Sequence, residues 1–103
     1  MSYAWRERFL DVNLTTGEIR TGILPCSTCI KTIGGIGLAA QLIVDNVPAT
    51  ADPLGPDNVL AFAAGPLGGT TWAGTGRLVV AARSPLTGLW GEASVGGYFA
   101  TQL

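Results

Sequence analysis

The sequence predicts an α+β fold, a small β-sheet domain with one main helix. Short stretches of alternating or continuous apolar residues, separated by glycine- and proline-rich turns, indicate strands. One longer stretch, residues 27–47, has apolar residues at helical spacing instead. With 103 residues the chain is one domain or less, and the core that it can bury is thin.

The first half predicts a β-hairpin followed by the helix. Residues 9–14 alternate apolar and polar side chains, as a half-buried strand does, and residues 18–24 form a second strand after a short turn. Pro25 ends that strand. The helical spacing then runs to about Asn46, with an interruption where glycines cluster at residues 34–37.

The second half predicts three more strands. The apolar run 59–64 has the length of a strand and predicts a buried one, and residues 76–83 and 89–93 predict the other two around a Ser-Pro turn. Gly96 and Gly97 then open a helical segment that stops within its first turns. Because so short a segment buries little, we expect the chain to be a truncated part of a larger domain.

Composition excludes several classes of function. Apolar residues make up 48% and charged residues 13%, whereas charged residues are usually about 25% of a soluble domain, so we expect the rest of a larger protein or a partner to cover part of the surface. A net charge of −1 gives no basis for binding nucleic acid, and no apolar run is long enough to cross a membrane. Charged residues from Arg6 to Arg8 interrupt the opening segment where a signal peptide would be apolar, which predicts a cytoplasmic protein. The chain has no histidine, the commonest general base.

Cys26-Ser27-Thr28-Cys29 is a CxxC motif with more than one interpretation. It follows a predicted strand and opens a helix, as a redox pair does, and a redox protein would form a disulfide between Cys26 and Cys29. As half of a metal site it would need two further ligands, and the chain has no other cysteine. Because an isolated CxxC carries little information, the sequence favours two small residues at a helix start.

Gly34-Gly35-Ile36-Gly37 also has two interpretations. Glycines before a helix can bind an anion. This motif is not GxGxxG, however, and no clear strand precedes it. The sequence therefore favours a helix break where two backbone segments pass closely.

The most informative pattern is Gly74-Thr75-Gly76-Arg77, with Ser94-Val95-Gly96-Gly97 further on. Glycines let backbone groups approach a ligand, and a helix N-terminus at Gly96 would favour a phosphate. Arg77 could bind that phosphate through two parallel hydrogen bonds. The residue types alone leave open the alternative of glycine-rich turns beside a solvated arginine. Arg83, next to the Ser-Pro turn, is predicted to be a solvated side chain.

Several longer motifs follow one another along essentially the whole chain. They are Arg8-Phe9-Leu10-Asp11-Val12-Asn13-Leu14-Thr15-Thr16-Gly17, Gly34-Gly35-Ile36-Gly37-Leu38-Ala39-Ala40, Asp52-Pro53-Leu54-Gly55-Pro56-Asp57-Asn58, Ala64-Gly65-Pro66-Leu67, Gly76-Arg77, Ser84-Pro85-Leu86-Thr87-Gly88 and Ala93-Ser94-Val95-Gly96-Gly97-Tyr98-Phe99. In order and spacing they resemble the aldehyde:ferredoxin oxidoreductase family. The shared order makes this resemblance more specific than any one motif.

The resemblance implies a β-sheet domain that cradles a pterin cofactor, with residues 1–103 as a partial N-terminal domain. Members of the family are much longer and hold tungsten, or sometimes molybdenum, between two pterins. A 4Fe-4S cluster passes the electrons from aldehyde oxidation to ferredoxin. The family's cluster cysteines and catalytic acid–base groups have no counterparts in this chain, so the resemblance implies no catalytic residue here and an inactive fragment.

The resemblance also implies roles for individual residues. Arg77 resembles the arginine that contacts a pterin phosphate. Ser94 stands where many members have asparagine, whose main-chain carbonyl binds the magnesium that bridges the two phosphates, and a backbone contact tolerates this change. Val95 and Gly96 resemble the backbone that lines the pterin. Ile36 replaces a basic residue that is common in the family, which leaves the glycine motif without an implied role.

A second class of function is consistent with the same residues. A non-catalytic binding or interaction module would keep the sheet, bind no pterin and dock onto a larger chain or a partner subunit. The partners implied by the resemblance are instead ferredoxin and the remainder of the same enzyme. The residues do not select the aldehyde, the metal or the oligomeric state.

Overall fold

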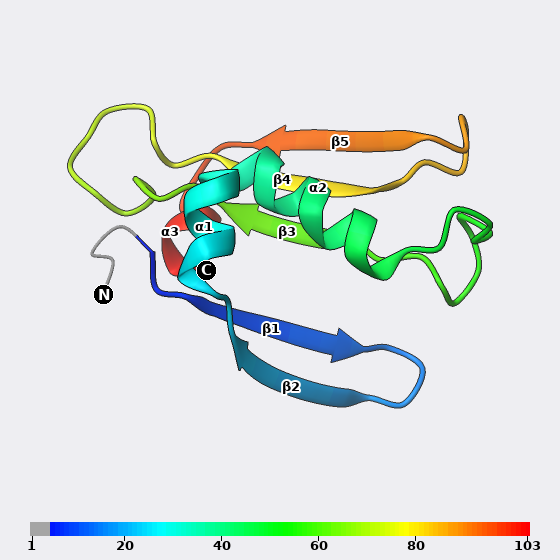
Figure 1. Ribbon diagram of the computed structural model, residues 1–103. Helices are drawn as coiled ribbons and strands as arrows, with labels where there is room; N and C mark the ends of the chain where they lie inside the picture. The colour runs from blue at the N-terminus through cyan, green and yellow to red at the C-terminus, as the bar shows by residue number, and fades with distance from the viewer. Residues whose placement is uncertain (1–4) are drawn as a thin grey trace.

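The computed structural model describes residues 5–103. Residues 1–4, which begin the segment predicted not to be a signal peptide, lie outside the described residues. The described chain forms two antiparallel sheets, a hairpin of β1 and β2 and a three-stranded sheet in the order β3-β4-β5, so the α+β class is confirmed (Figure 1). The elements are β1 (Arg8–Asn13), β2 (Glu18–Ile23), α1 (Cys26–Thr32), α2 (Gly35–Asn46), β3 (Ala61–Ala64), β4 (Leu78–Arg83), β5 (Trp90–Val95) and α3 (Phe99–Gln102).

The turn between β1 and β2 depends on the side chain of Asn13. Its Oδ1 accepts hydrogen bonds from the backbone N–H groups of Thr15, at 3.0 Å, and Thr16, at 3.2 Å. The carbonyl of Asn13 accepts another from Gly17 at 2.8 Å, and the φ of 75° at Gly17 favours glycine. The predicted hairpin is therefore confirmed, with strand ends within one residue of their expected positions.

The hairpin has one apolar face that no part of the described chain buries. The residues that share this face by register are Leu10, Val12, Ile19 and Ile23. Their exposed fractions run from 45% to 77%. The expectation that the first strand is half-buried is wrong for residues 5–103, because the alternation exists but its apolar side meets no covering layer there.

The helical stretch divides into α1 and α2 at Ile33 and Gly34. These residues have φ values of 67° and 119°, and the two helices are bent by 118°. A Cβ on Gly34 would lie 3.0 Å from the carbonyl oxygen of Ala64. The predicted interruption and close backbone approach are both confirmed. Among the described residues no single helix is long and apolar enough to cross a membrane, and α1 with α2 meets that criterion only as a bent pair, by length and composition.

A small core of alanines holds α2 against the second sheet. The buried members are Ala39 of α2, Ala61 and Ala63 of β3, and Ala81 of β4, each at most 5% exposed. Because each position carries only a methyl group, the helix and the sheet can approach closely. Larger apolar side chains pack around this core, namely Leu38, Leu42, Ile43 and Val79. Figure 1 shows α2 lying across β3 and β4, the strands that carry the core.

β3 is shorter than the predicted strand because Asn58 replaces a strand residue in the hydrogen-bonding pattern. Its Nδ2 donates to the carbonyl of Arg83 at 3.0 Å, and its Oδ1 accepts from the Arg83 N–H at 3.3 Å. By the β3–β4 register these backbone groups would otherwise face Val59, so pairing begins only at Ala61. The run is also not buried throughout, since Phe62 is 47% exposed.

The remaining boundaries differ from prediction by a few residues. β4 begins later than predicted, at Leu78, and β5 continues further, to Val95. The final helix begins at Phe99 rather than at Gly96 and has only four residues. It packs against the sheet through Phe99 and Phe62, whose ring centroids are 6.3 Å apart.

The chain exposes more surface than a folded monomer of its size. Its accessible surface is 7432 Å², whereas about 5,500 Å² is usual for this mass. Its radius of gyration is 14.0 Å, against about 13 Å for a compact domain of this length. Exposed apolar side chains lie on the hairpin face, on α2 and just before β3, where Val44 is 76% and Leu60 is 60% exposed. This surface is suited to being covered.

We therefore expect the 103-residue chain alone to self-associate. Light scattering should show species larger than a monomer, because burial of the hairpin face lowers the free energy of the associated state. Replacing Leu10 and Ile19 by threonine keeps β propensity and should shift the distribution toward monomer. Leu86→Ser is the control, since Leu86 is 93% exposed on a separate turn. A monodisperse monomer with a sharp cooperative melt would contradict this expectation.

Candidate functional site

The predicted site residues come together at one end of the β4–β5 ladder. The register pairs Leu78 with Val95, and the same register places Arg77 opposite Gly96. The Arg77 side chain lies over this glycine, with Nη1 3.0 Å from the position that a Cβ on Gly96 would take. A Cβ at position 96 would make the guanidinium shift by a few tenths of an ångström. Glycine therefore gives Arg77 room to lie across the end of the ladder.

The backbones stay close together beyond this pair. A Cβ on Gly76 would lie 3.0 Å from the carbonyl oxygen of Gly97, and Gly97 has a φ of 109° that favours glycine. The two segments that leave the ladder therefore pass each other without side chains between them. This leaves backbone groups accessible next to the arginine.

The Arg77 guanidinium is available to a ligand. The residue is exposed, and within residues 5–103 its guanidinium makes no hydrogen bond or ion pair. An arginine carries its charge at any physiological pH and presents several donors in a fixed plane. Its position over Gly96 thus puts an unused bidentate donor at the strand ends.

The carbonyl of Ser94 points out of the sheet. The N–H of Ser84 donates to the carbonyl of Leu89 at 2.7 Å, which makes these two residues a hydrogen-bonded pair. Hydrogen-bonded and non-hydrogen-bonded pairs alternate along an antiparallel ladder, so Ser94, opposite Val79, belongs to a non-hydrogen-bonded pair. Its N–H and C=O therefore point away from β4. Since β5 is the edge strand of the described sheet, they face an open edge.

Within residues 5–103 no helix N-terminus contributes to this site. The expectation that a helix opens at Gly96 is wrong, because α3 begins at Phe99, with Tyr98 as its N-cap. A helix of four residues has too few aligned peptide groups for a substantial dipole. Any anion binding here would therefore depend on Arg77 and on loop backbone groups.

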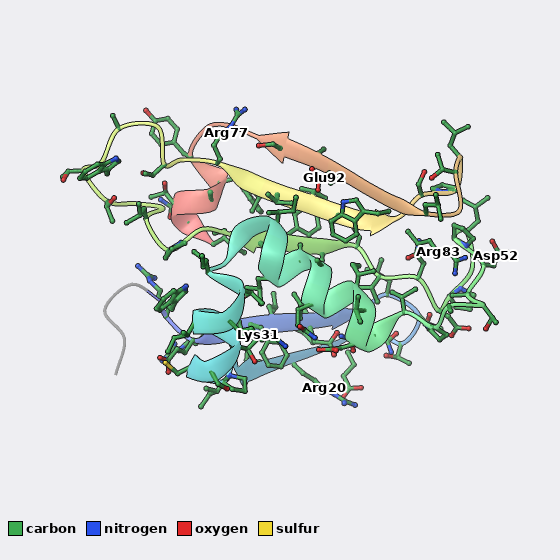
Figure 2. All side chains as sticks on the ribbon, turned by 45° about the horizontal axis from the view of Figure 1, so that its top comes forward. Arg20, Lys31, Asp52, Arg77, Arg83 and Glu92 are labelled. Atoms are coloured by element: carbon green, nitrogen blue, oxygen red, sulfur yellow. The ribbon has the colours of Figure 1, made fainter. Side chains whose placement is uncertain are left out.

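Arg83 has a structural role, and the prediction that its side chain is solvated is wrong. Its Nε donates to the carbonyl of Gly88 at 2.8 Å, and its Nη1 donates to the carbonyls of Ala49, at 2.5 Å, and Pro48, at 3.4 Å. The side chain thus ties the β4–β5 turn to the segment after α2. Figure 2 shows Arg77 and Arg83 near opposite ends of β4.

The two cysteines lie one helical turn apart in α1, after β2, as predicted. Cys26 is partly exposed and Cys29 is buried. Burial raises the pKa of the Cys29 thiol, and the nearby Glu7 carboxylate raises it further. Among residues 5–103 no three side chains of the kinds that bind metals come together.

Glu7 is a residue that the sequence did not single out. Its Oε1 is buried and has no hydrogen-bond partner among the described residues. Its backbone has a φ of 55°, in the region that favours glycine, and its carbonyl accepts from the N–H of Leu24 at 2.8 Å. No sequence signal marks this position, because it depends on how the hairpin meets α1.

Comparison with known proteins agrees with the fold and with the order of the motifs. The family profile described as "Aldehyde ferredoxin oxidoreductase, N-terminal domain" matches residues 9–103. The chain belongs to this family. Its curated relatives include the tungsten-containing aldehyde ferredoxin oxidoreductases of Pyrococcus furiosus, 44% identical, and Thermococcus kodakarensis, 43% identical, each over 96 residues. These alignments cover 93% of this chain and 16% of each relative.

A solved structure shares the fold closely. It is described as the active-site complex BamBC of benzoyl coenzyme A reductase with 1,5-dienoyl-CoA. It matches with a TM-score of 0.94 and 37% identity, over 98% of this chain and 16% of that chain. The resemblance to the family and the predicted α+β domain are thereby confirmed. The chain spans about a sixth of the length of these relatives, so the individual roles of Arg77, Ser94, Val95 and Gly96 stay predictions.

The contacts of Arg83 predict a local loss of stability in Arg83→Ala. Hydrogen bonds from a charged donor each contribute about 1.5–3 kcal/mol, so amide exchange in residues 48–58 and 84–89 should become roughly 10- to 100-fold faster. Arg83→Lys should restore only part of the protection, because an ammonium cannot reach all the carbonyls with a planar fork. Hydrogen–deuterium exchange with mass spectrometry measures both variants.

Arg20→Ala is the matched control. Arg20 is also a strand arginine, but its partner is the exposed Glu18, at 2.9 Å on the hairpin. Loss of this exposed ion pair should leave the amide exchange rates of residues 48–58 and 84–89 unchanged. Equal exchange in Arg83→Ala and the unaltered chain would contradict the structural role of Arg83.

Proposed function

We propose that this chain supplies part of the phosphate and magnesium contacts of a pterin cofactor in a tungsten- or molybdenum-dependent oxidoreductase. The observation that carries the proposal is the Arg77 guanidinium, unpaired within residues 5–103 and lying over Gly96, next to a strand edge where the Ser94 carbonyl points outward. A cationic hydrogen-bond donor and a neutral carbonyl oxygen at the same end of the ladder match a ligand that contains both phosphate and a divalent cation.

The residues fit these two ligand groups chemically. A phosphate accepts two parallel hydrogen bonds from a guanidinium, and Arg77 has no other partner in residues 5–103. Magnesium prefers oxygen ligands, and a main-chain carbonyl suffices whatever side chain the residue carries. Serine at position 94 is therefore compatible with the role that asparagine has in many members. Val95 and Gly96 would line the pterin with backbone, and the missing side chain of Gly96 leaves room for the guanidinium.

In the full-length protein we propose oxidation of an aldehyde to a carboxylic acid in the cytoplasm. The bound tungsten–pterin group would supply the two-electron chemistry, and electrons would leave through a 4Fe-4S cluster to ferredoxin. The share of this chain is to bind and orient the cofactor. It contributes no cluster ligand, and we assign it no catalytic residue. The names of the curated relatives support the tungsten and aldehyde parts of the proposal.

Arg77→Ala in the full-length protein should reduce cofactor retention. Loss of a charge-assisted hydrogen bond of about 1.5–3 kcal/mol corresponds to roughly tenfold to hundredfold weaker binding. Arg77→Lys should recover only part of it, since lysine keeps the charge and loses the planar fork. Elemental analysis for tungsten and molybdenum, together with pterin per chain, gives the result without an activity assay. Equal cofactor content in Arg77→Ala and the unaltered protein would remove Arg77 from the site.

A glycine pair tests the same site while keeping the arginine. Gly96→Ala adds a Cβ 3.0 Å from Nη1 of Arg77, so the guanidinium must shift by a few tenths of an ångström, and we expect a smaller loss of cofactor than in Arg77→Ala. Gly65→Ala is the control, because nothing lies within 4 Å of a Cβ there and its φ is not positive. If both variants keep full cofactor content, the position of Arg77 over Gly96 has no bearing on binding.

The proposed reaction predicts that the full-length protein, expressed with tungstate without oxygen, oxidises aldehydes with reduction of ferredoxin or a viologen dye. Because the similar solved structure is described as a benzoyl coenzyme A reductase, reduction of an aromatic CoA thioester is the alternative reaction to assay. Turnover of aldehydes alone would support the proposal. Turnover of the thioester alone would contradict the aldehyde part. A protein that retains neither metal nor pterin would instead support a non-catalytic binding module.

A further inference from the structure

Cys26 and Cys29 are placed to act together. Both belong to α1, in its first two turns, and are three residues apart. In an α-helix this spacing puts the two Cα atoms about 5 Å apart, within the range of about 4.4–6.8 Å that disulfides span. The Cβ atoms of such pairs are roughly 5–6 Å apart, slightly more than the 3.5–4.5 Å or so of a relaxed disulfide. The first turn of the helix must therefore tighten for the bond to form, which favours a readily reduced disulfide.

The surroundings of the two thiols differ in a way that suits stepwise disulfide exchange. Cys26 is the first residue of the helix and is partly exposed, so it can meet a reagent from solvent. Cys29 is 2% exposed and can meet only its neighbour. The Glu7 carboxylate, whose Oε1 has no hydrogen-bond partner within residues 5–103, lies close enough to raise the pKa of the Cys29 thiol. The raised pKa makes Cys29 a poor attacking thiol toward reagents in solvent, so in this scheme it reacts second, once Cys26 carries a mixed disulfide.

We propose that Cys26 and Cys29 form a reversible dithiol–disulfide site that exchanges with small-molecule disulfides such as glutathione disulfide. The proposal is independent of the pterin site. It reverses the preference of the sequence alone for two small residues at a helix start, because the structure adds the unequal burial of the two thiols and the buried oxygen of Glu7. In a reducing cytoplasm such pairs are transient redox sensors rather than permanent cross-links.

The exchange balances in two steps. The Cys26 thiolate attacks one sulfur of the small disulfide RSSR, forming Cys26–S–S–R and releasing the other half as a thiolate, which takes up the proton that Cys26 lost. Cys29, deprotonated as it reacts, attacks Sγ of Cys26 and releases the second half, which takes up the remaining proton. Two protein thiols are oxidised by two electrons, and one RSSR is reduced to two RSH.

The sequence allows a direct test, because trypsin cleavage after Arg20 and Lys31 gives one peptide, residues 21–31, with both cysteines. The folded full-length protein is incubated with mixtures of reduced and oxidised glutathione, quenched in acid, alkylated and digested. We expect the peptide to change from doubly alkylated to unlabelled and lighter by two hydrogen atoms, and to revert with dithiothreitol. A peptide that stays doubly alkylated in every mixture would overturn the proposal.

Single variants separate the two roles. Cys29→Ala, which keeps this buried position apolar, should trap glutathione on Cys26 and should react at a rate close to that of the unaltered protein. Cys26→Ser should slow glutathione incorporation at least about tenfold, because the remaining thiol is buried and less ionised. Circular dichroism confirms that each variant is folded. Glutathione on Cys29 at the unaltered rate would overturn the assignment of Cys26 as the attacking thiol.

Discussion

The close contact between α2 and the β3–β4 sheet is the constraint on which the rest of the structure depends. Alanine at Ala39, Ala61, Ala63 and Ala81 lets backbone approach backbone, so the helix lies directly on the strands. The helix can reach this position only if the chain turns sharply before it, which explains the bend at Gly34 and its approach to Ala64. A larger side chain at any of these positions would move the helix and, with it, the sheet that carries the proposed site.

The two arginines near the ends of the β4–β5 ladder have different surroundings. At one end the Arg83 guanidinium donates hydrogen bonds to the carbonyls of Gly88, Ala49 and Pro48, which fix the turn. At the other end Arg77 lies over a glycine and has no partner in the described chain. A guanidinium that already donates to several carbonyls gains little from a ligand, whereas an unpaired one gains most of a charge-assisted bond. The difference in surroundings, more than the residue type, is the reason for proposing Arg77 rather than Arg83 as the binding arginine.

Local chemistry made much of the fold predictable. A short turn between the first two strands, the alternation of the hairpin and the glycine interruption of the helix each depend on residues close in sequence, and all three were predicted; the part that Asn13 takes in the turn was not. The errors arose where residues far apart in sequence determine the structure. The Asn58 side chain forms hydrogen bonds with the backbone N–H and C=O of Arg83, which shortens β3. The Arg83 side chain binds the carbonyl of Ala49, which gives this arginine a structural role. Neither effect has a local signature.

The candidate site was predictable only in part, for a similar reason. Motif order pointed to Arg77 and Gly96, but that they lie opposite each other follows from the register of the β4–β5 ladder. The outward direction of the Ser94 carbonyl likewise depends on which pairs of the ladder are hydrogen-bonded, and that is set by the Ser84–Leu89 contact at the turn. A sequence shows which residues are present, and one residue of register decides whether a carbonyl faces a neighbour strand or a ligand.

The open edge of β5 connects the proposed site to the way this domain can associate. An unpaired edge strand invites pairing with another strand, and such pairing would consume the N–H and C=O groups of Ser94 that face outward. Strand addition along this part of β5 would therefore compete with a cation for the Ser94 carbonyl. The apolar face of the hairpin has no such conflict, because it is a face rather than an edge and lies on a separate sheet. A covering layer can thus pack on the hairpin while the end of β5 stays free for a ligand.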